Sequence, residues 1–422
     1  MNNKALSDAA DFTTGLSLNK GLGHLGHCAT AVPAWNLLHE EISLPAAVLY
    51  EDRLRHNLAW MQHFIAAYGV HLAPHGKTTM APKLFQMQLD AGAWGITVAT
   101  AQQALVAQRH GVRRVLMANQ LVGKENMAVI ARLLRDPTFD YYCLVDSPDL
   151  VEQSGAYFAG LGLQLQVMLE LGVAGGRAGV RNDEQMEAVL ASLSRWKESI
   201  ALRGVEIYEG ILEDEGAIRS FLRRAVSVTQ RLGRSGHFQG APILLSGAGS
   251  AWYDVVAEEF AAEDLGKSIE IVLRPGCYLT HDVGAYRRAQ ARISEANPIA
   301  RQMASGLLPA LHVWAYVHSV PETGKAIVGM GKRDAAFDSG LPVPALWFRP
   351  GRIIPEKAPR HWEVTRMMDQ HAYLSIGPAD DLLPGDMIGF DICHPCLTFD
   401  KWRRLLIVDA GYQVVDIVET CF

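Results

Sequence analysis

Short apolar runs alternate with longer segments of helical period from about residue 44 to residue 275. The runs are rich in Val, Ile and Leu and contain no regular polar positions, which is typical of parallel strands buried on both faces. They lie at Ala46–Tyr50, Val70–Ala73, Gly95–Ala99, Val115–Ala118, Tyr142–Asp146, Leu163–Leu169, Gly204–Tyr208, Ile243–Ser246 and Ile269–Leu273. Amphipathic helices are predicted between them at Thr100–His110, Asn126–Arg135, Asp183–Lys197 and Ala217–Leu232.

The number of apolar runs indicates the architecture of this region. Without the first run, eight remain between Val70 and Leu273, the number that a closed (β/α)₈ barrel of the TIM type requires. A doubly wound open sheet has the same periodicity, so the pattern alone leaves it open as the alternative. We therefore predict an α/β barrel preceded by one extra strand.

Beyond about residue 295 the long helical patterns stop. Apolar runs broken by Pro and Gly follow instead, which is typical of a mostly β domain. These runs are Leu311–Val317, Lys325–Gly329, Ala372–Ile376, Asp386–Ile392 and Leu405–Val408. The predicted organisation is a loop-rich N-terminal segment over residues 1–44, a barrel with its leading strand over 45–295, and a β domain over 296–422.

Composition narrows the class of protein. Hydrophobic residues make up 49% of the 422 residues and charged residues 20%, which predicts a globular chain with a substantial core. No apolar stretch is long enough for a membrane span, and the first twelve residues do not resemble a secretory signal. A net charge of −6 without a basic block argues against a nucleic-acid partner. Six cysteines are too few for a disulfide framework, which fits a reducing cytoplasm. Taken together, these features lead us to expect a cytoplasmic enzyme with a small-molecule substrate.

A glycine motif near the N-terminus matches the dinucleotide-binding fingerprint G-x-G-x-x-G at Gly21, Gly23 and Gly26. That fingerprint needs a strand directly before it and an acidic residue at a strand end about 20 residues later. Neither is present here. The segment is therefore interpreted as a loop.

The apolar run Val70–Ala73 is followed directly by Pro74, His75, Gly76, Lys77 and Thr78. In a barrel, Lys77 would lie at the C-terminal end of the first strand, where barrel enzymes place their catalytic groups. A lysine in this position can form a Schiff base. An ordinary surface lysine in a loop is the alternative.

Glycine-rich turns follow three later strands. Arg177 is a cation between glycines after the fifth barrel strand, and Ser246–Ser250 and Arg274–Tyr278 follow the seventh and eighth. Loops after strands seven and eight of a barrel recurrently bind phosphate through backbone N–H groups. Together with Lys77, they predict a site for a phosphorylated cofactor.

The β domain contains Cys393, His394, Pro395 and Cys396. A redox dithiol of the C-x-x-C type belongs at the start of a helix after a strand, and we expect no helix here. On an extended segment, His394 and Cys396 would point to the same face and Cys393 to the other. An imidazole and a thiolate on one face suit Zn²⁺ and leave coordination positions open.

These residues together resemble the fold-type III pyridoxal-phosphate enzymes, in particular the D-serine dehydratase (D-serine deaminase) and D-threonine aldolase family with its alanine-racemase-like barrel. The resemblance extends from about residue 44 to the C-terminus. Its most specific motifs are residues 74–78 and His394–Asp400, with Asp386, Lys401 and Trp402 nearby in the sequence. In this fold the leading strand joins the β domain, which accounts for Ala46–Tyr50.

The resemblance implies roles for individual residues. Lys77 would carry pyridoxal 5′-phosphate as a Schiff base, and His394 and Cys396 would bind Zn²⁺ or another divalent metal. The remaining cofactor contacts correspond to His75, Arg177, Tyr208, Ser246, Gly247, Gly249, Ser250, Gly276 and Tyr278. A homodimer is also implied.

Two departures from the family pattern concern substrate range more than cofactor use. The family often continues K-T-H-K after the lysine, whereas Thr79 and Met80 follow Thr78 here. Gly329 replaces an Asp that commonly stands before a Gly-x-Lys motif in the β domain. Residues 1–43, with His24 and His27, fall outside the resemblance.

The resemblance implies a dehydratase (ammonia-lyase) that converts a D-β-hydroxy amino acid, such as D-serine or D-threonine, into a 2-oxo acid and ammonia. Lys77, His394 and Cys396 would be its catalytic residues. D-threonine aldolase activity is the main alternative, although aldolases of the family tend to carry H-x-D where Cys396 stands. An amino-acid racemase would need no metal pair. A non-catalytic pyridoxal-phosphate-binding protein would resemble the barrel alone.

Overall fold

The computed structural model describes residues 19–23, 34–262, 265–266 and 268–422. The chain divides into two compact units. The barrel unit comprises Leu58–Tyr278 and Ala289–Gly306, and the β unit comprises Met1–Asn57, Leu279–Arg288 and Leu307–Phe422. Among the described residues, no helix combines the length and the apolar character needed to span a bilayer.

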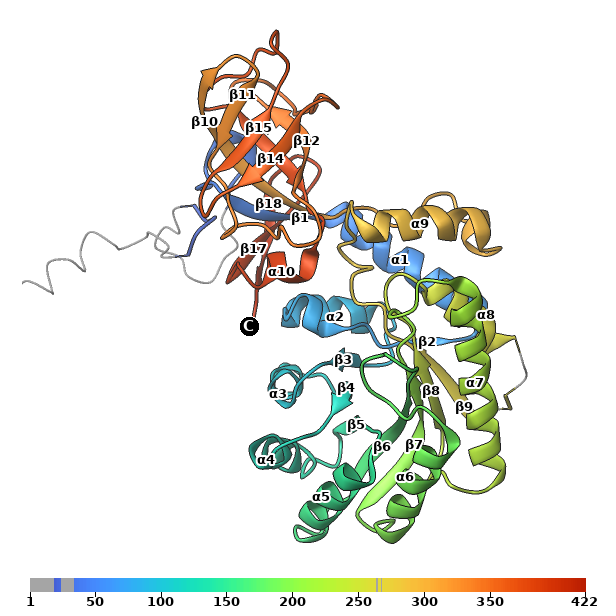
Figure 1. Cartoon of the computed structure of the whole chain (residues 1–422). Helices are drawn as coiled ribbons and strands as arrows, with labels where there is room; N and C mark the ends of the chain where they lie inside the picture. Colours follow the sequence, from blue (N-terminus) through green and yellow to red (C-terminus); the bar gives the residue numbers. More distant parts are fainter. Residues whose placement is uncertain (1–18, 24–33, 263–264, 267) are drawn as a thin grey trace, which may run out of the picture. The chain divides into compact units, whose positions relative to one another are not determined.

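Eight parallel strands form the centre of the barrel unit, in the order β2-β9-β8-β7-β6-β5-β4-β3 (Figure 1). Their bounds are β2 His71–Leu72, β3 Ile96–Val98, β4 Arg114–Gln120, β5 Asp140–Val145, β6 Leu165–Leu171, β7 Ile200–Ile207, β8 Ile243–Gly247 and β9 Ile269–Leu273. The two outer strands of this order also meet, because the backbone N–H of Trp94 donates to Leu72 O at 2.7 Å and that of Thr97 donates to Pro74 O at 2.9 Å. The predicted barrel is confirmed, and the open sheet is wrong.

Helices precede, separate and follow the strands of the barrel: the first of them leads into β2, and the last follows β9. They are α1 Glu51–Tyr68, α2 Pro82–Asp90, α3 Ala101–Arg109, α4 Lys124–Leu133, α5 Pro148–Ala159, α6 Asp183–Arg195, α7 Glu215–Arg234, α8 Tyr253–Ala261 and α9 Ala285–Ala296. The side chains of Thr100, Ser147, Asn182 and Asp214 accept a backbone N–H in the first turns of α3, α5, α6 and α7. These N-caps satisfy donors that a helix leaves unpaired at its start. The four predicted helices are confirmed to within a few residues.

The barrel interior is apolar away from its rim. The side chains that pack there come from five of the strands and the segment after β2, namely Ala73, Leu116, Tyr142, Leu144, Met168, Leu244 and Val272. Burial of both faces of the sheet explains why the strand sequences lack polar alternation.

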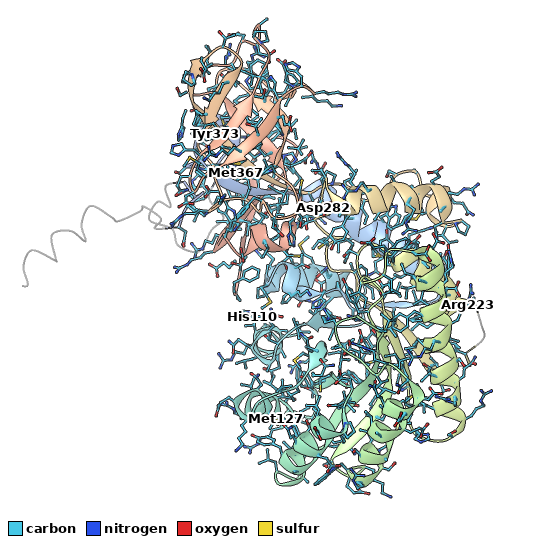
Figure 2. All side chains as sticks on the ribbon, viewed as in Figure 1. His110, Met127, Arg223, Asp282, Met367 and Tyr373 are labelled. Carbon is cyan, nitrogen blue, oxygen red and sulfur yellow. The ribbon has the colours of Figure 1, made fainter. Side chains whose placement is uncertain are left out.

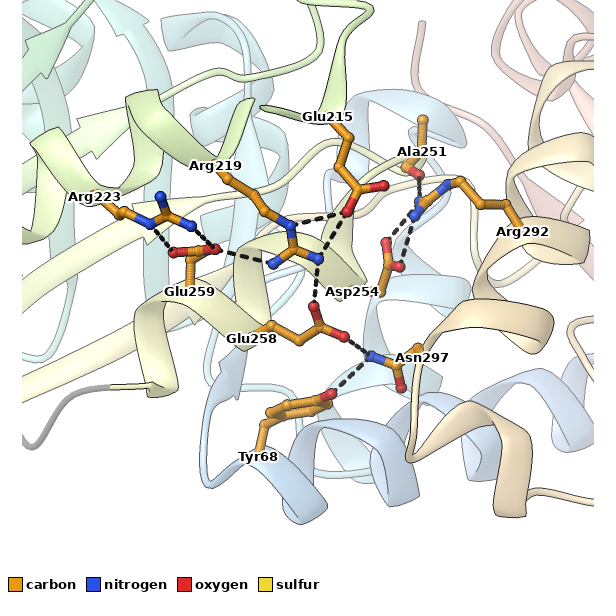
Figure 3. A network of polar contacts seen from close by, with 10 residues as sticks. All are labelled: Tyr68, Glu215, Arg219, Arg223, Ala251, Asp254, Glu258, Glu259, Arg292 and Asn297. Atoms are coloured by element: carbon orange, nitrogen blue, oxygen red, sulfur yellow. Dashed lines mark hydrogen bonds and ion pairs between the residues drawn. The ribbon is translucent and has the colours of Figure 1, made fainter. Parts of the chain in front are cut away.

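A polar network joins four helices on the outside of the barrel unit (Figure 3). Arg219 on α7 bonds Glu215 of its own helix and Glu258 and Glu259 on α8. The amide of Asn297, just after α9, donates to Glu258 Oε1 at 2.8 Å and to the hydroxyl of Tyr68 on α1 at 2.7 Å. Such a network fixes the packing of neighbouring helices rather than forming a reactive site.

The β unit is built on a ten-stranded sheet with the path β13-β12-β16-β10-β1-β17-β18, extended by β11, β15 and β14. The bounds are β1 Ala46–Tyr50, β10 Leu311–Glu322, β11 Lys325–Val328, β12 Val343–Phe348, β13 Glu356–Lys357, β14 Glu363–Met367, β15 Ala372–Ser375, β16 Met387–Asp391, β17 Arg404–Val408 and β18 Val414–Glu419. Strand β1 pairs antiparallel with β10 and parallel with β17. The leading strand therefore joins the β unit, as expected.

Four strands of this unit were not predicted: β12, β13, β14 and β18. Strand β13 has two residues, and β14 has only two buried positions in five. Met367 and Tyr373, labelled in Figure 2, lie on β14 and β15, which pair with each other at the less buried part of the sheet. Short, half-exposed strands lack the apolar runs on which the prediction depended.

The segment after β16 is not extended, so this expectation was wrong. Helix α10 runs over Pro395–Phe399, with His394 as its N-cap at φ −145° and Pro395 in the first turn. Proline favours the first position of a helix because its fixed φ suits the turn and its missing N–H is not needed there. Strand alternation therefore does not determine where the Cys396 side chain points.

Part of the N-terminal glycine motif is described. Gly21 has a φ of 73°, and Leu22 is buried in the core of the β unit. Gly23 is also described, whereas the rest of the motif from His24 on, and also His27, lies outside the described residues.

Candidate active site

The predicted cofactor residues of the barrel unit gather at one rim. His75 and Lys77 follow β2, Arg177 follows β6 and Tyr208 follows β7. The glycine-rich loops end or follow β8 and β9, with Ser246, Gly247, Gly249, Ser250, Gly276 and Tyr278. Because all eight strands are parallel, their C-terminal ends lie at the same mouth of the barrel.

Lys77 is an exposed residue of a short 3₁₀ helix, η2 (Gly76–Thr78). The adjacent His75 has a pKa well below its usual value because of burial, and because Lys77, Arg274 and Arg177 surround it with positive charge. Its Nδ1 is enclosed and makes no hydrogen bond. The rim thus combines an accessible amine with a neutral imidazole and two guanidinium groups.

The loops after β2 and β9 approach closely at Gly276. A Cβ at this position would lie 2.6 Å from Thr78 Oγ1 and 2.8 Å from His75 O. Only a glycine allows this approach. The loop after β9 is therefore held directly against the segment that carries Lys77.

The N–H groups of the glycine-rich loop after β8 already bind a carboxyl group of the barrel. The buried carboxylate of Glu209 accepts hydrogen bonds from the N–H groups of Ala248 at 3.1 Å and Gly249 at 2.6 Å, and Ala248 adopts a left-handed φ of 78°. Consecutive N–H groups in such a turn form a concave anion site. Here a side chain of the barrel occupies these two donors, so a phosphate would bind other donors of the rim.

Two of the predicted contacts, Ser246 and Tyr278, are buried. The Ser246 hydroxyl is fully buried; it donates to Val272 O at 3.0 Å and accepts from Arg274 Nε at 3.0 Å. Tyr278 is 1% exposed, and burial raises the pKa of its hydroxyl. Ser250 does lie at the rim, where its Oγ accepts the N–H of Cys277 at 3.1 Å. The structure thus supports loop-ordering roles for Ser246 and Ser250.

Arg177 and Tyr208 line one small pocket at this mouth. The Arg177 guanidinium carbon lies 4.9 Å from the centre of the Tyr208 ring. Glu170, at the end of β6, also lines the pocket and is 3% exposed. The pocket therefore offers a cation, an aromatic face and a buried acid.

Neither this acid nor its neighbour Glu206 was predicted from the sequence, and Arg274 was predicted only as part of the loop after the eighth strand. Glu170 pairs in register with Glu206 on β7, and Glu206 forms a buried ion pair with Arg274. Burial raises the pKa of Glu170 to about 7, helped by the charge of Glu206, and burial also raises the pKa of Glu206. The signal in the sequence was one acid near the C-terminal end of each of two mainly apolar strands.

The raised pKa of Glu170 predicts a loss of stability with rising pH. A carboxyl with a higher pKa in the folded state stabilises the fold fully below its ordinary value of 4.5, and this contribution is lost as the pH rises through about 7. The loss should be roughly 3–4 kcal/mol. Urea unfolding of the cofactor-free protein between pH 4.5 and 8 measures it. Glu170→Gln should flatten this dependence, and an equal slope in both proteins would contradict the assignment.

The second set of predicted residues lies in the β unit. The imidazole of His394 contacts three polar side chains. Its Nδ1 lies 2.8 Å from Asp338 Oδ2 and 3.5 Å from Ser339 Oγ, and the ring is also hydrogen-bonded to Cys396. The pKa of His394 is raised to about 9. The hydrogen bond with Cys396 contributes most to this rise and the hydrogen bond with Asp338 contributes next, whereas burial lowers the pKa. His394 and Cys396 are thus neighbours despite the helical turn.

Asp282, labelled in Figure 2, is a further acid of the β unit near this pair. Its Oδ1 accepts the N–H groups of Gly284 at 2.8 Å and Tyr286 at 3.1 Å, at the start of α9. Burial raises its pKa, while the charge of His394 lowers it. Asp282 is therefore engaged in holding a helix start.

The donor chemistry fits a weak, open metal site. An imidazole and a thiol side by side are ligands that Zn²⁺ accepts. In the part of the chain that the structure describes, no group of three or more His, Cys, Asp and Glu side chains is arranged to hold a metal ion. The β unit thus offers two protein ligands and leaves the remaining coordination positions to water or substrate.

Comparison with protein families assigns both units. The model described as "Alanine racemase, N-terminal domain" matches residues 50–266, which is more than half of the chain. A second model, described as "Putative serine dehydratase domain", matches residues 310–408. The chain therefore belongs to the alanine racemase N-terminal domain family, and its predicted place among the fold-type III pyridoxal-phosphate enzymes is confirmed.

Known proteins that match most of this chain are named as aldolases or dehydratases. D-threonine aldolase from Arthrobacter is 26% identical over 388 residues, covering 90% of this chain and 92% of that protein. The crystal structure of D-threonine aldolase from Filomicrobium marinum matches with a TM-score of 0.75 at 23% identity, covering 93% and 98% of the two chains. D-threo-3-hydroxyaspartate dehydratase from Delftia matches with a TM-score of 0.71 at 23% identity, covering 92% and 99%. A cysteine-to-alanine mutant of a dehydratase of that name was solved in the metal-free form.

Proposed function

We propose that this chain is a pyridoxal-phosphate-dependent lyase of D-β-hydroxy amino acids, and specifically a dehydratase that releases a 2-oxo acid and ammonia from substrates such as D-serine. Two observations carry the proposal: an exposed lysine at the barrel rim and, within the β unit, an imidazole hydrogen-bonded to a thiol. The relatives named above are aldolases and dehydratases of D-threonine and 3-hydroxyaspartate, which supports this substrate class.

The barrel rim would bind the cofactor and move the proton. When bound, pyridoxal phosphate supplies an electron sink that acidifies the bonds at the substrate Cα. Lys77 would hold the cofactor covalently and, once displaced by the substrate amine, remove the Cα proton as a general base. Arg177 would orient an anionic oxygen of the cofactor or substrate. The phosphate of the cofactor would bind N–H groups of the loops after β8 and β9 other than those of Ala248 and Gly249, which Glu209 accepts.

The β unit would act on the β-carbon. His394 and Cys396 would hold a divalent metal, with Zn²⁺ as the ion that suits their donors. When bound, such an ion supplies Lewis-acid assistance for loss of the β-hydroxyl, a poor leaving group. The open coordination positions match that task, because the ion must exchange water for a substrate oxygen.

Aldol cleavage is the second candidate, favoured by the aldolase names of the relatives that cover most of the chain. Both reactions share the substrate class, and they differ in whether the Cα–H or the Cα–Cβ bond breaks. Cys396, where aldolases of the family tend to carry Asp, favours the dehydratase. Incubation with D-serine, D-threonine and D-allo-threonine should give 2-oxo acids and ammonia. Glycine and an aldehyde as the main products would instead assign an aldolase.

Metal removal should suppress dehydration while the cofactor stays bound. Chelation is expected to lower turnover of D-serine by at least about 100-fold, because Lewis-acid assistance is worth several kcal/mol, and to leave the cofactor absorption band unchanged. Cys396→Ala should do the same and reduce the zinc content. Cys421→Ala, which alters another partly exposed cysteine of the β unit, is the matched control. Full activity of the metal-free enzyme would contradict the metal's role.

A further inference from the structure

The imidazole of His394 is held from one side by a carboxylate on a neighbouring loop. Asp338 and Ser339 lie between β11 and β12, and Asp338 Oδ2 is 2.8 Å from His394 Nδ1. The Ser339 hydroxyl donates to the same carboxylate at 3.2 Å. No role was predicted for either residue from the sequence.

This contact determines the tautomer of the ring. An ionised carboxylate can only accept hydrogen bonds, so the hydrogen must be on Nδ1 of His394. In the neutral ring the lone pair is then on Nε2, on the far side of the imidazole from Asp338. A metal ion needs that lone pair, so the tautomer set by Asp338 is the one able to bind it.

We propose that Asp338 is the positioning residue of the metal site: its carboxylate fixes the tautomer and orientation of His394 and so presents Nε2 to the ion. The inference rests on the proposed function, because it assumes that His394 is a metal ligand. Carboxylates that accept the second N–H of a metal-binding histidine typically contribute 10–100-fold to metal affinity. Asp338 would therefore act through His394 without touching the ion.

The loop that carries Asp338 is fastened to the histidine segment. The thiol of Cys393, next to His394, donates to Leu341 O at 3.2 Å. Gly340 has a φ of 126°, and a Cβ there would lie 3.2 Å from Cys393 Sγ. The close packing of this loop against Cys393 keeps the carboxylate at a constant place relative to the ring.

Zinc affinity of the full-length enzyme tests the inference. The dissociation constant would be measured by competition with a chromogenic chelator for the natural protein, Asp338→Ala, Asp338→Asn and His394→Ala. We expect Asp338→Ala to weaken zinc binding about 10–100-fold, and Asp338→Asn to weaken it less, because the amide oxygen can still accept from Nδ1. Asp369→Ala, at an exposed carboxylate facing Arg333, is the control and should bind zinc normally.

The outcomes separate the inference from the proposed function. Unchanged affinity in Asp338→Ala, with a clear loss in His394→Ala, would overturn the positioning role alone. Unchanged affinity in His394→Ala would overturn the metal site itself. A Co²⁺-substituted enzyme distinguishes a direct ligand: its visible absorption should be the same in the natural protein and Asp338→Asn, and an altered band pattern would make Asp338 a ligand. Thermal unfolding without metal should be similar in all variants, which excludes a general loss of folding.

Discussion

Replacing Lys77 by alanine is expected to reduce turnover of D-serine by at least about 1,000-fold. Two functions are lost together, the covalent attachment of the cofactor and the removal of the Cα proton, and proton transfer alone typically contributes 10²–10⁴-fold. The measurement is the rate of 2-oxo acid formation at saturating substrate. The structure supports this expectation because Lys77 is an exposed lysine at the barrel mouth, beside the neutral His75.

Chemical trapping provides the control for this prediction. Borohydride reduction of the natural enzyme should attach the cofactor to Lys77, as peptide mapping would show. Lys83→Ala should retain both the label and the activity, since Lys83 lies on α2 outside the turn that carries Lys77. A label on Lys83 or Lys332 would disprove the assignment of Lys77.

Replacing Arg274 by methionine is expected to destabilise the protein by about 3–5 kcal/mol. Arg274 and Glu206 are 5% and 2% exposed, and the guanidinium also donates to Ile207 O at 2.9 Å and to Ser246 Oγ at 3.0 Å. Without Arg274, the Glu206 carboxylate would be buried without a partner, or would have to take up a proton. The cost should therefore be larger at pH 8 than at pH 6, as urea unfolding at the two pH values would show.

Two further variants test the cause of this loss. Adding Glu206→Gln to Arg274→Met should recover part of the stability, because the unpaired charge is gone. Arg223→Met removes an arginine that is 66% exposed and paired with Glu259, and exposed pairs contribute at most about 1 kcal/mol. If Arg274→Met were no more harmful than Arg223→Met, the buried pair would not support the barrel rim.

The barrel could be predicted because its strands are buried on both faces, so each appears in the sequence as a run of Val, Ile and Leu. Lys77 could be located for a related reason, since it directly follows such a run. The partners of the rim could not be found in this way. Glu209 reaches a loop about 40 residues away in the sequence, and its hydrogen bonds to Ala248 and Gly249 exist only once β7 and β8 lie side by side.

The site in the β unit shows the opposite difficulty. The residue types His394 and Cys396 were sufficient to suggest a metal, but their geometry was derived from strand alternation that ends at Asp391. Pro395, in the first turn of α10, is the local signal that a helix starts here. Asp338 could not be predicted for a different reason. It lies 56 positions before His394 in the sequence, and nothing in its own segment indicates that the two side chains meet.

The position of β1 between β10 and β17 has a consequence for how the chain is made. On the ribosome, β1 emerges roughly 260 residues before β10, a wait of about 13–50 s at 5–20 residues per second. The barrel strands β2–β9 are complete during this wait, so the barrel can close while β1 still lacks both neighbours. An unpaired apolar strand is prone to aggregation. Nascent chains arrested before residue 311 should therefore need a chaperone at Ala46–Tyr50, whereas the finished chain should not.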